Sequence, residues 1–214
     1  MILYANGDSH SLGAMKDKSI GQSFVDLIAN KFNLSVINQA HPASSASRII
    51  RTTRDFFSKN YPKDIIVLIG WGTWEREEWE YQDKYYNVMK NWHTHLPEEL
   101  HKRYDNWVKL LTPELIDEKS RHIHKEIYGL HQYLQELKIP HLFFNCMYNF
   151  FSIKESEMLD WNNCYIGPYD NDLSYYWYLT KKHFDSDRWY HFDASGHQAW
   201  ADFLTDYIQE NKLL

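Results

Sequence analysis

The chain has 214 residues, a formal net charge of −6 at pH 7, and hydrophobic residues at 43% of its positions. So many apolar side chains can bury enough surface to offset the entropy lost on ordering, which argues against an intrinsically disordered protein. The negative charge argues against a nucleic-acid-binding protein, because phosphate backbones are bound by clustered cations. The length predicts one domain over residues 1–214.

The N-terminus and the cysteines indicate a cellular compartment. The first residues carry no cationic leader and only a few apolar side chains before Gly7, so we expect neither a signal peptide nor a membrane span. Cys146 and Cys164 lie in unlike contexts, and a disulfide framework is not expected. These features predict a cytoplasmic protein without a membrane partner. The sequence does not indicate an oligomeric state.

Short apolar runs alternate with helical patterns along the chain. The predicted strands are Ile2–Tyr4, Ser35–Asn38, Ile65–Ile69 and His141–Asn145. Apolar residues at helical spacing predict helices within Phe24–Phe32, Ile49–Phe57, Ile123–Leu137 and Ala199–Ile208. Nearly unbroken apolar strands are typical of parallel sheets that are covered on both faces. The alternation therefore predicts an α/β fold, a three-layer α/β/α sandwich around a mainly parallel sheet.

Two segments interrupt this alternation. The first, at about 75–119, is long, polar and rich in aromatic residues, and we interpret it as a helical insertion after the third strand that shapes a substrate pocket. The second, Phe150–His183, is rich in Tyr, Asn and Asp and is predicted to form loops. The tryptophans beside the third strand, Trp71 and Trp74, are expected in the core, with stacking on a sugar ring as the alternative.

A candidate nucleophile follows the first predicted strand, in the run Gly7–Asp8–Ser9–His10. Ligands of open α/β sheets bind outside the carboxyl ends of the strands, where Ser9 would lie. The residues after it can present backbone N–H groups to an anion. The alternative is an ordinary turn in which Asp or Ser caps the next helix.

A candidate base lies near the end of the chain. A serine nucleophile needs a base, and the base needs an orienting carboxylate. Two histidines each follow an aspartate by four residues, His191 after Asp187 and His197 after Asp193. Asp193 is expected to cap the last helix, which places His197 in its first turn and His191 in the preceding loop. The loop residue is freer to point across the ends of the strands, although taken alone it could be an ordinary surface histidine. Asp185 is a further candidate for the orienting carboxylate.

Together, the GDSHS run near the N-terminus and the HFDASGHQAWA run before the last helix resemble the motifs of the SGNH (GDSL-type) hydrolases. The resemblance spans nearly the whole chain and implies a flavodoxin-like sandwich. It implies a serine esterase that uses no cofactor and acts on small acyl esters, including acetyl groups on carbohydrate. In that mechanism Ser9 is the nucleophile, His191 the base and Asp187 its orienting carboxylate. The alternative base is His197, and the alternative orienting residues are Asp193 and Asp185.

The two oxyanion-binding motifs depart from the family pattern. Ala43 stands where the family has a glycine whose N–H binds the oxyanion, and this donor survives if the site does not require a positive φ angle. The run Gly70–Thr73 replaces Gly-x-Asn-Asp and so lacks the asparagine donor. The resemblance then implies an oxyanion hole made by the N–H groups of Ser9 and Ala43 with a donor near Gly72 and Thr73, or from residues 74–76. Loss of one such donor costs roughly 10²–10³ in rate.

Other kinds of site are less well supported by the sequence. Several histidines could suggest metal ligands, but no HExxH motif or cysteine pair accompanies them, so we expect them at the solvated surface and expect no metal. They are His93, His95, His101, His122 and His124. Neither a Walker loop nor a GxGxxG motif is present, which argues against a nucleotide. Two hypotheses remain: a serine esterase, or a binding module of the same fold with little or no activity.

Overall fold

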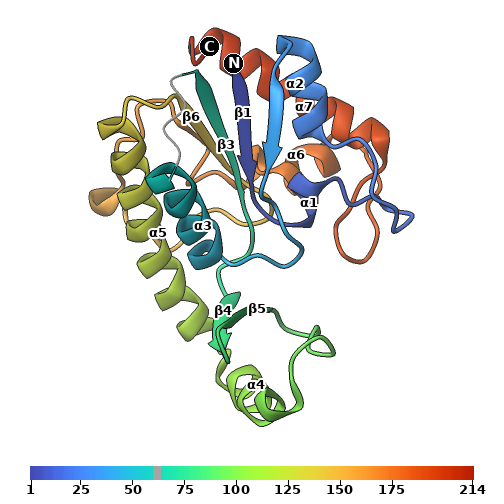
Figure 1. Ribbon diagram of the computed structural model, residues 1–214, viewed down its shortest axis with the longest axis vertical. Helices are drawn as coiled ribbons and strands as arrows, with labels where there is room; N and C mark the ends of the chain where they lie inside the picture. Colours follow the sequence, from blue (N-terminus) through green and yellow to red (C-terminus); the bar gives the residue numbers. More distant parts are fainter. Residues whose placement is uncertain (60–63) are drawn as a thin grey trace.

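The computed structural model describes residues 1–59 and 64–214, and within them five parallel strands form the main sheet in the order β2-β1-β3-β6-β7. These strands are β1 (Ile2–Asn6), β2 (Ser35–Asn38), β3 (Ile65–Trp71), β6 (His141–Asn145) and β7 (Tyr165–Ile166) (Figure 1). On one face of the sheet lie α2 (Phe24–Phe32), α6 (Tyr175–Lys181) and α7 (Ala194–Glu210). On the other lie α3 (Ala46–Lys59) and α5 (Pro113–Glu136). The predicted three-layer α/β/α sandwich is confirmed.

Strand β3 shows why the sheet is covered on both faces. All of its residues are buried, as its unbroken apolar sequence predicts. Ile66 and Leu68 pack in the core on the side of α2 and α7, whereas Val67 and Ile69 pack in the core on the side of α3 and α5. Side chains that alternate between two hydrophobic layers leave no polar face on the strand.

Trp71 and Trp74 belong to the hydrophobic core between the sheet and the helices α3 and α5. Trp71 is fully buried and Trp74 is 1% exposed, and the Trp74 ring stacks on Phe150. The expectation that these tryptophans are core residues agrees with this burial, whereas stacking on a sugar ring would require an exposed face.

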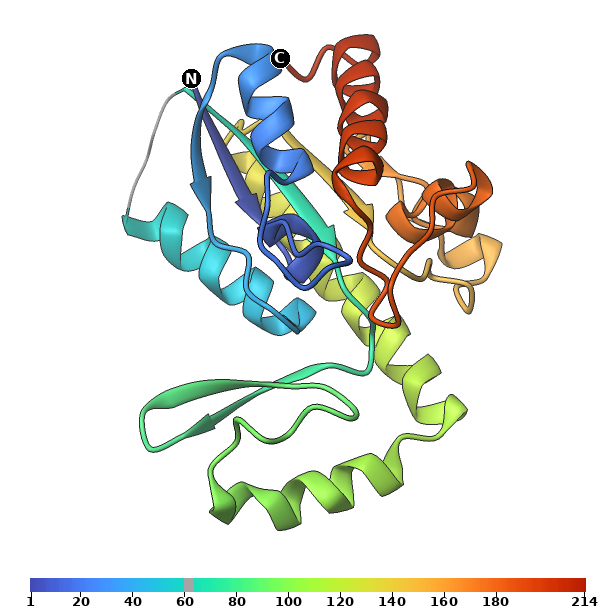
Figure 2. The same ribbon diagram turned by 90° about the vertical axis from the view of Figure 1, so that its right-hand side faces the viewer.

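The segment expected as a helical insertion does contain a helix, α4 (Glu98–Leu110), but it begins as a β-hairpin. Strands β4 (Glu77–Tyr81) and β5 (Lys84–Val88) pair in antiparallel fashion and form a separate lobe with α4 (Figure 2). Gln82 and Asp83 both have positive φ angles, as a tight hairpin turn requires. The sequence prediction missed this hairpin because its alternating pattern is hidden among consecutive charged and aromatic residues.

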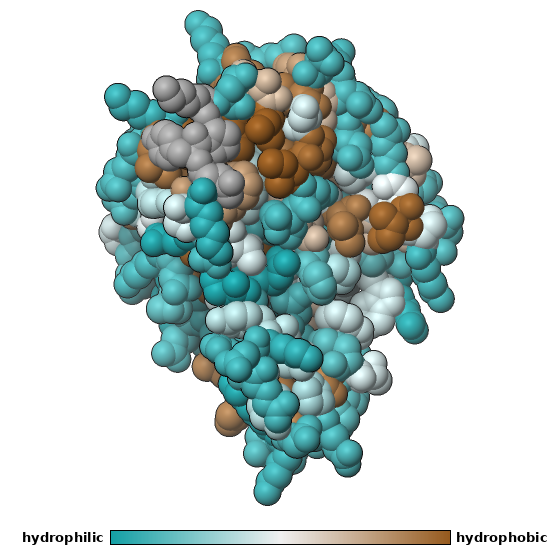
Figure 3. Space-filling view, viewed as in Figure 1, coloured by the Kyte–Doolittle hydropathy of each residue, from teal (hydrophilic) through white to brown (hydrophobic). Residues whose placement is uncertain are grey.

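The lobe has a small core of its own, in which the Trp79 and Trp107 rings meet at 85°. Its surface in the view of Figure 3 is mainly hydrophilic. Arg51 of α3 makes a bidentate contact with Glu78 of β4, with distances of 2.9 and 2.6 Å, and this contact links the lobe to the sandwich.

Helix α5 begins at Pro113, not near Ile123 as the apolar pattern indicated. Thr112 caps it and proline occupies its first turn, while its first turns carry mainly polar side chains that show no apolar repeat. The last residues of the expected insertion are therefore the start of α5. No helix in the described part of the chain is both long enough and apolar enough to cross a membrane.

The stretch predicted as loops, Phe150–His183, also contains regular elements, so that prediction was wrong in part. These elements are η1 (Glu155–Glu157), β7, η2 (Asn171–Leu173) and α6. Helix α6 is capped by Ser174, and its buried residues Tyr175 and Leu179 lie four positions apart. Its helical period is hidden because neighbouring positions are also aromatic. The carboxyl ends of the main strands point towards the hairpin lobe (Figure 2).

Candidate active site

Ser9 lies just beyond the carboxyl end of β1, at the start of the one-turn helix α1 (Ser9–Leu12). The turn that leads to it requires Gly7, which has a φ of 152°. A Cβ at Gly7 would lie 2.4 Å from Ser11 Oγ and 2.9 Å from the Gly70 carbonyl oxygen, so no larger residue fits. Asp8 caps α1 by accepting a hydrogen bond from the His10 N–H. The capping interpretation of this motif and the catalytic one are therefore compatible.

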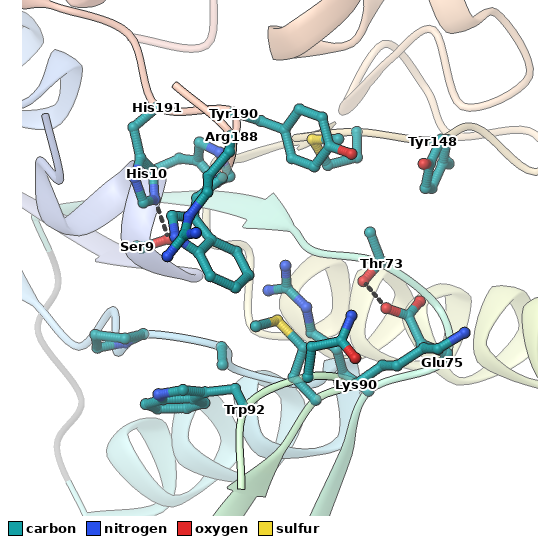
Figure 4. A pocket seen from close by; sticks show the side chains of 17 residues that line it. Ser9, His10, Thr73, Glu75, Lys90, Trp92, Tyr148, Arg188, Tyr190 and His191 are labelled. Atoms are coloured by element: carbon teal, nitrogen blue, oxygen red, sulfur yellow. Dashed lines mark hydrogen bonds between the residues drawn. The ribbon is translucent and has the colours of Figure 1, made fainter. Parts of the chain in front are cut away.

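The structure brings His191 to Ser9. The distance between Ser9 Oγ and His191 Nε2 is 3.0 Å, within hydrogen-bond range (Figure 4). On the other side of the ring, His191 Nδ1 lies 3.4 Å from Asp187 Oδ2. Residues that are 182 positions apart in the sequence thus form one Ser–His–Asp arrangement.

Asp187 also organises the loop that carries His191. Its Oδ1 accepts hydrogen bonds from the N–H groups of Trp189 and His191, at 2.8 and 2.9 Å. Its own N–H donates to the His191 carbonyl oxygen at 2.9 Å. This closed turn accommodates the four-residue spacing between the two residues. Asp185 is exposed and has no contact with His191 among the residues that the structure describes.

The environment of His191 favours a neutral imidazole. Burial lowers the pKa of His191 below its ordinary value of 6.5, and the nearby His10 lowers it further. The carboxylates of Asp187 and Asp8 act in the opposite direction without cancelling these effects. An imidazole that is neutral at pH 7 can accept a proton from a hydroxyl group.

His197 has a different environment. Its ring is fully buried and lies parallel to the Phe24 ring, with 5.7 Å between centroids. Its Nδ1 accepts a hydrogen bond from the Phe24 N–H at 3.3 Å, and its Nε2 lies 3.4 Å from the Ala14 carbonyl oxygen. Burial lowers the pKa of His197 to about 4. Both ring nitrogens thus contact backbone groups, and Asp193 caps α7 through the N–H groups of Ser195 and Gly196.

Ala43 adopts a φ of 56°, in the left-handed region that favours glycine. The condition under which alanine replaces glycine without strain is therefore not met. Ala43 nevertheless lines the same cavity as Ser9. Within the described residues, the N–H groups of Ser9 and Ala43 have no hydrogen-bond acceptor, so both can donate to an oxyanion.

This strain gives a testable expectation for position 43. Ala43→Val should lower the free energy of unfolding by about 1–3 kcal/mol, because a β-branched residue fits a positive φ poorly. Ala43→Gly should change it by less than about 1 kcal/mol, because relief of strain offsets the loss of a buried methyl group. Urea unfolding of the two variants measures the difference. Equal stability of the two would contradict a strained backbone at Ala43.

Thr73 and Gly72 were the other expected oxyanion residues. The Thr73 hydroxyl donates to Glu75 Oε1 at 2.6 Å, so its proton is already engaged (Figure 4). Gly72 is buried, and a Cβ at this position would lie 2.6 Å from Arg76 Nη1. Neither residue presents a free side-chain donor to the site.

Ser9 and His191 open into a cavity of about 570 Å³. Its walls come from the loops after β2, β3 and β6, the segment after β5 and the loop before α7. Arg76, from the 74–76 stretch considered as a source of an oxyanion donor, also lines the cavity, and residues that the sequence analysis did not assign to the site include Lys90, Tyr148 and Arg188. Arg188 lies on the side of Ser9 and His191, whereas Lys90 lies on the opposite side near Glu75 (Figure 4). The insertion was expected to shape a pocket, but these particular side chains carry no sequence signal.

A buried charge network lies beneath Ser9. Asp8 is fully buried and contacts His10 Nδ1 and Arg76 Nη1, each at 2.7 Å. Burial alone would raise the pKa of Asp8, but these two partners outweigh it and hold the pKa far below its ordinary value. These two partners therefore favour the ionised form of Asp8.

The histidines considered as metal ligands mostly have other partners. His95 Nε2 lies 2.7 Å from the Asn87 carbonyl oxygen, and His124 Nε2 lies 2.9 Å from the Tyr169 hydroxyl. The expectation of a surface position was wrong for His124, which is 2% exposed because it packs among the aromatic rings of Phe150, Trp161 and Tyr169. Among the described residues, two other groups have donor atoms close enough to share an ion. These groups are His131, His141 and Cys164, and Asp8, His10 and Cys146. In each, two members already contact each other directly, with His131 Nδ1 2.8 Å from His141 Nε2 and His10 Nδ1 2.7 Å from Asp8 Oδ1.

Comparison with known proteins gives matches at the level of structure. Neither a protein-family model nor a curated protein sequence matches the chain. Among solved structures, it is similar to a lipase/acylhydrolase from Enterococcus faecalis (TM-score 0.52, 13% identity, 98% of this chain and 96% of the other). A catalytic mutant of an acetylxylan esterase from Geobacillus stearothermophilus is also similar (TM-score 0.53, 11% identity, 96% and 93%). So is an esterase from Pseudoalteromonas sp. (TM-score 0.50, 9% identity, 97% and 97%).

The chain has the fold of these ester hydrolases. The match covers almost the full length on both sides, so the main sheet and the helices on both of its faces belong to the shared architecture. Within this hydrolase fold, the Ser9–His191–Asp187 arrangement lies at the carboxyl ends of the strands, where α/β sheets bind ligands.

Proposed function

We propose that the protein is a serine esterase or acylhydrolase of the SGNH type that acts through an acyl-serine intermediate. The observation that carries this proposal is the 3.0 Å distance between Ser9 Oγ and His191 Nε2 at the edge of an open cavity. The fold shared with ester hydrolases supports it. The roles of Ser9, His191 and Asp187 are part of the proposal.

In the proposed acylation step, Ser9 Oγ adds to the acyl carbon while its proton passes to His191 Nε2. Asp187 stabilises the imidazolium through Nδ1, and the N–H groups of Ser9 and Ala43 stabilise the oxyanion. The carbon–oxygen bond to the leaving alcohol then breaks, and His191 returns the proton to that alcohol. In deacylation a water molecule adds to the acyl carbon and gives its proton to His191. That proton returns to Ser9 Oγ as the acid departs.

The proposed substrates are small acyl esters, including acetyl groups on carbohydrate. The cavity of about 570 Å³ has a size suited to a small-molecule site. Trp92 and Trp189 line it, and Trp189 is 37% exposed, so these rings could stack on a sugar. One similar structure belongs to an acetylxylan esterase, which supports the same substrate class.

Two measurements test this function. The wild-type protein should hydrolyse p-nitrophenyl acetate, and a fluorophosphonate should attach covalently to Ser9, as located by peptide mass spectrometry. The competing hypothesis is a binding module with little or no activity, and it predicts neither result. Hydrolysis no faster than in buffer, together with no label on Ser9, would exclude the esterase.

The lowered pKa of His191 predicts the pH dependence. The base must be neutral to accept the serine proton, so kcat/KM should fall as pH decreases through an inflection below 6.5 and be level above it. Asp187→Asn should move the inflection lower, because the Asp187 charge raises the pKa of His191. Rates on a neutral ester from about pH 4 to pH 8 measure this. An inflection above that of free histidine would contradict the role of burial.

A further inference from the structure

In the run Gly70–Thr73, Gly72 stands where the family motif has its asparagine. The side chain of Arg76 occupies the space next to Gly72. A Cβ built at Gly72 would lie 2.6 Å from Arg76 Nη1 and 3.1 Å from Arg76 Cζ. The Arg76 guanidinium therefore fills the space in which any side chain at position 72 would begin. A larger residue at position 72 would require the guanidinium to move.

Arg76 is held firmly in this position. Its side chain is only 9% exposed, and Nη1 donates to Asp8 Oδ2 at 2.7 Å and to the Ser44 carbonyl oxygen at 3.5 Å. Asp8 immediately precedes Ser9, and Ser44 immediately follows Ala43, so both partners lie next to the proposed backbone donors. Arg76 is one of the residues that line the cavity that contains Ser9.

Arg76 also has unused donors. Within the described part of the chain, Nε is buried without a hydrogen-bond partner, and no hydrogen bond is recorded for Nη2. Nε has almost no accessible surface, so the donor available to an acceptor on a bound substrate is Nη2. A guanidinium holds several N–H groups in one plane, so Nη1 can bind Asp8 while Nη2 stays free to donate to another acceptor.

We propose that Arg76 is the side-chain donor of the oxyanion hole, in the place that asparagine holds in the motif this chain resembles. The inference rests on the proposed esterase function. When Ser9 Oγ adds to the acyl carbon, the carbonyl oxygen becomes negative and accepts a hydrogen bond from Arg76, with no proton transferred. A charge-assisted bond of this kind is stronger than one from a neutral amide. Asp8 keeps the guanidinium in place before the charge develops, which avoids reorganisation during the reaction.

The test compares Arg76→Ala with Arg51→Ala. Arg51 also binds a carboxylate, that of Glu78, but does not line the cavity. Arg76→Ala should lower kcat for p-nitrophenyl acetate by roughly 10²–10³ with a much smaller change in KM. Added guanidinium chloride, far below denaturing concentrations, should restore part of the lost rate. Arg51→Ala should retain kcat.

The outcomes separate this inference from the esterase function itself. In the first case, wild type is active and Ser9→Ala is not. If folded Arg76→Ala then keeps its kcat, or if guanidinium does not restore its rate, Arg76 has only a structural role and the inference fails. If wild type is inactive, the proposed function fails first. If Arg76→Ala does not fold because Asp8 loses a partner, Asp8→Asn/Arg76→Ala is compared with Asp8→Asn. The double variant should then show the same drop in kcat, and equal rates would overturn the inference.

Discussion

Ser9→Ala is expected to lower kcat for ester hydrolysis by about 10⁴- to 10⁶-fold. The alanine variant keeps the cavity and the oxyanion donors, but no hydroxyl lies 3.0 Å from His191 Nε2 to form the acyl intermediate. The small loss of volume at a half-buried position should leave the fold intact. Steady-state hydrolysis of p-nitrophenyl acetate and the thermal unfolding midpoint are the two measurements.

Ser58→Ala is the matched control, because Ser58 is an exposed serine near the end of α3 whose hydroxyl contacts only the Asp55 carbonyl oxygen within the described structure. This variant should hydrolyse the ester at the wild-type rate. Activity of Ser9→Ala comparable to that of Ser58→Ala would show that the chemistry does not depend on Ser9, and the proposed mechanism would have to be abandoned.

His191→Asn should lower kcat by roughly 10⁴-fold or more, because asparagine cannot accept the proton of Ser9. The side chain is partly exposed and lies in the loop before α7, so the free energy of unfolding should change little. Kinetics with the same ester and urea unfolding test the two statements together. A variant with substantial activity would show that another group acts as the base.

His197→Asn provides the contrast, because this histidine also follows an aspartate by four residues. Its ring is buried and contacts the backbone of Phe24 and Ala14. The substitution should cost about 1–3 kcal/mol of stability through lost hydrogen bonds and packing. The kcat of the folded protein should stay near that of wild type. A loss of kcat as large as that of His191→Asn, without loss of stability, would reverse the proposed assignment of the base.

The local features of the fold could be predicted from the sequence alone. Strand β3 is apolar at nearly every position, which is the pattern of a strand covered on both faces. The cap at Asp193 and the apolar repeat that follows it locate α7. Ser9 could be placed at the carboxyl end of β1 because Gly7 permits the turn after that strand. In each case the sequence pattern lies within a few neighbouring residues. Hydrophobic periodicity, helix capping and turn-forming residues are local properties of this kind.

Two features of the site depend on tertiary structure because they involve residues that only folding brings together. Asp187 and His191 are close in sequence, but the contact of His191 with Ser9 joins the two ends of the chain. The positive φ of Ala43 comes from its loop, in which the neighbouring His41 and Pro42 are held by Asn87 of the hairpin.

The setting of Ser9 changes most between the sequence and the structure. In the sequence, the asparagine donor is missing, and its replacement could come from Gly72, Thr73 or the stretch 74–76 that contains Arg76. In the structure, Arg76 fills the space above Gly72 and is paired with Asp8. Sequence motifs determined where the proposed nucleophile lies. The surroundings of Ser9 were decided by the packing of the Arg76 side chain against Gly72, which has no Cβ. Such packing depends on shape and distance in three dimensions, so it leaves no periodic pattern in the sequence.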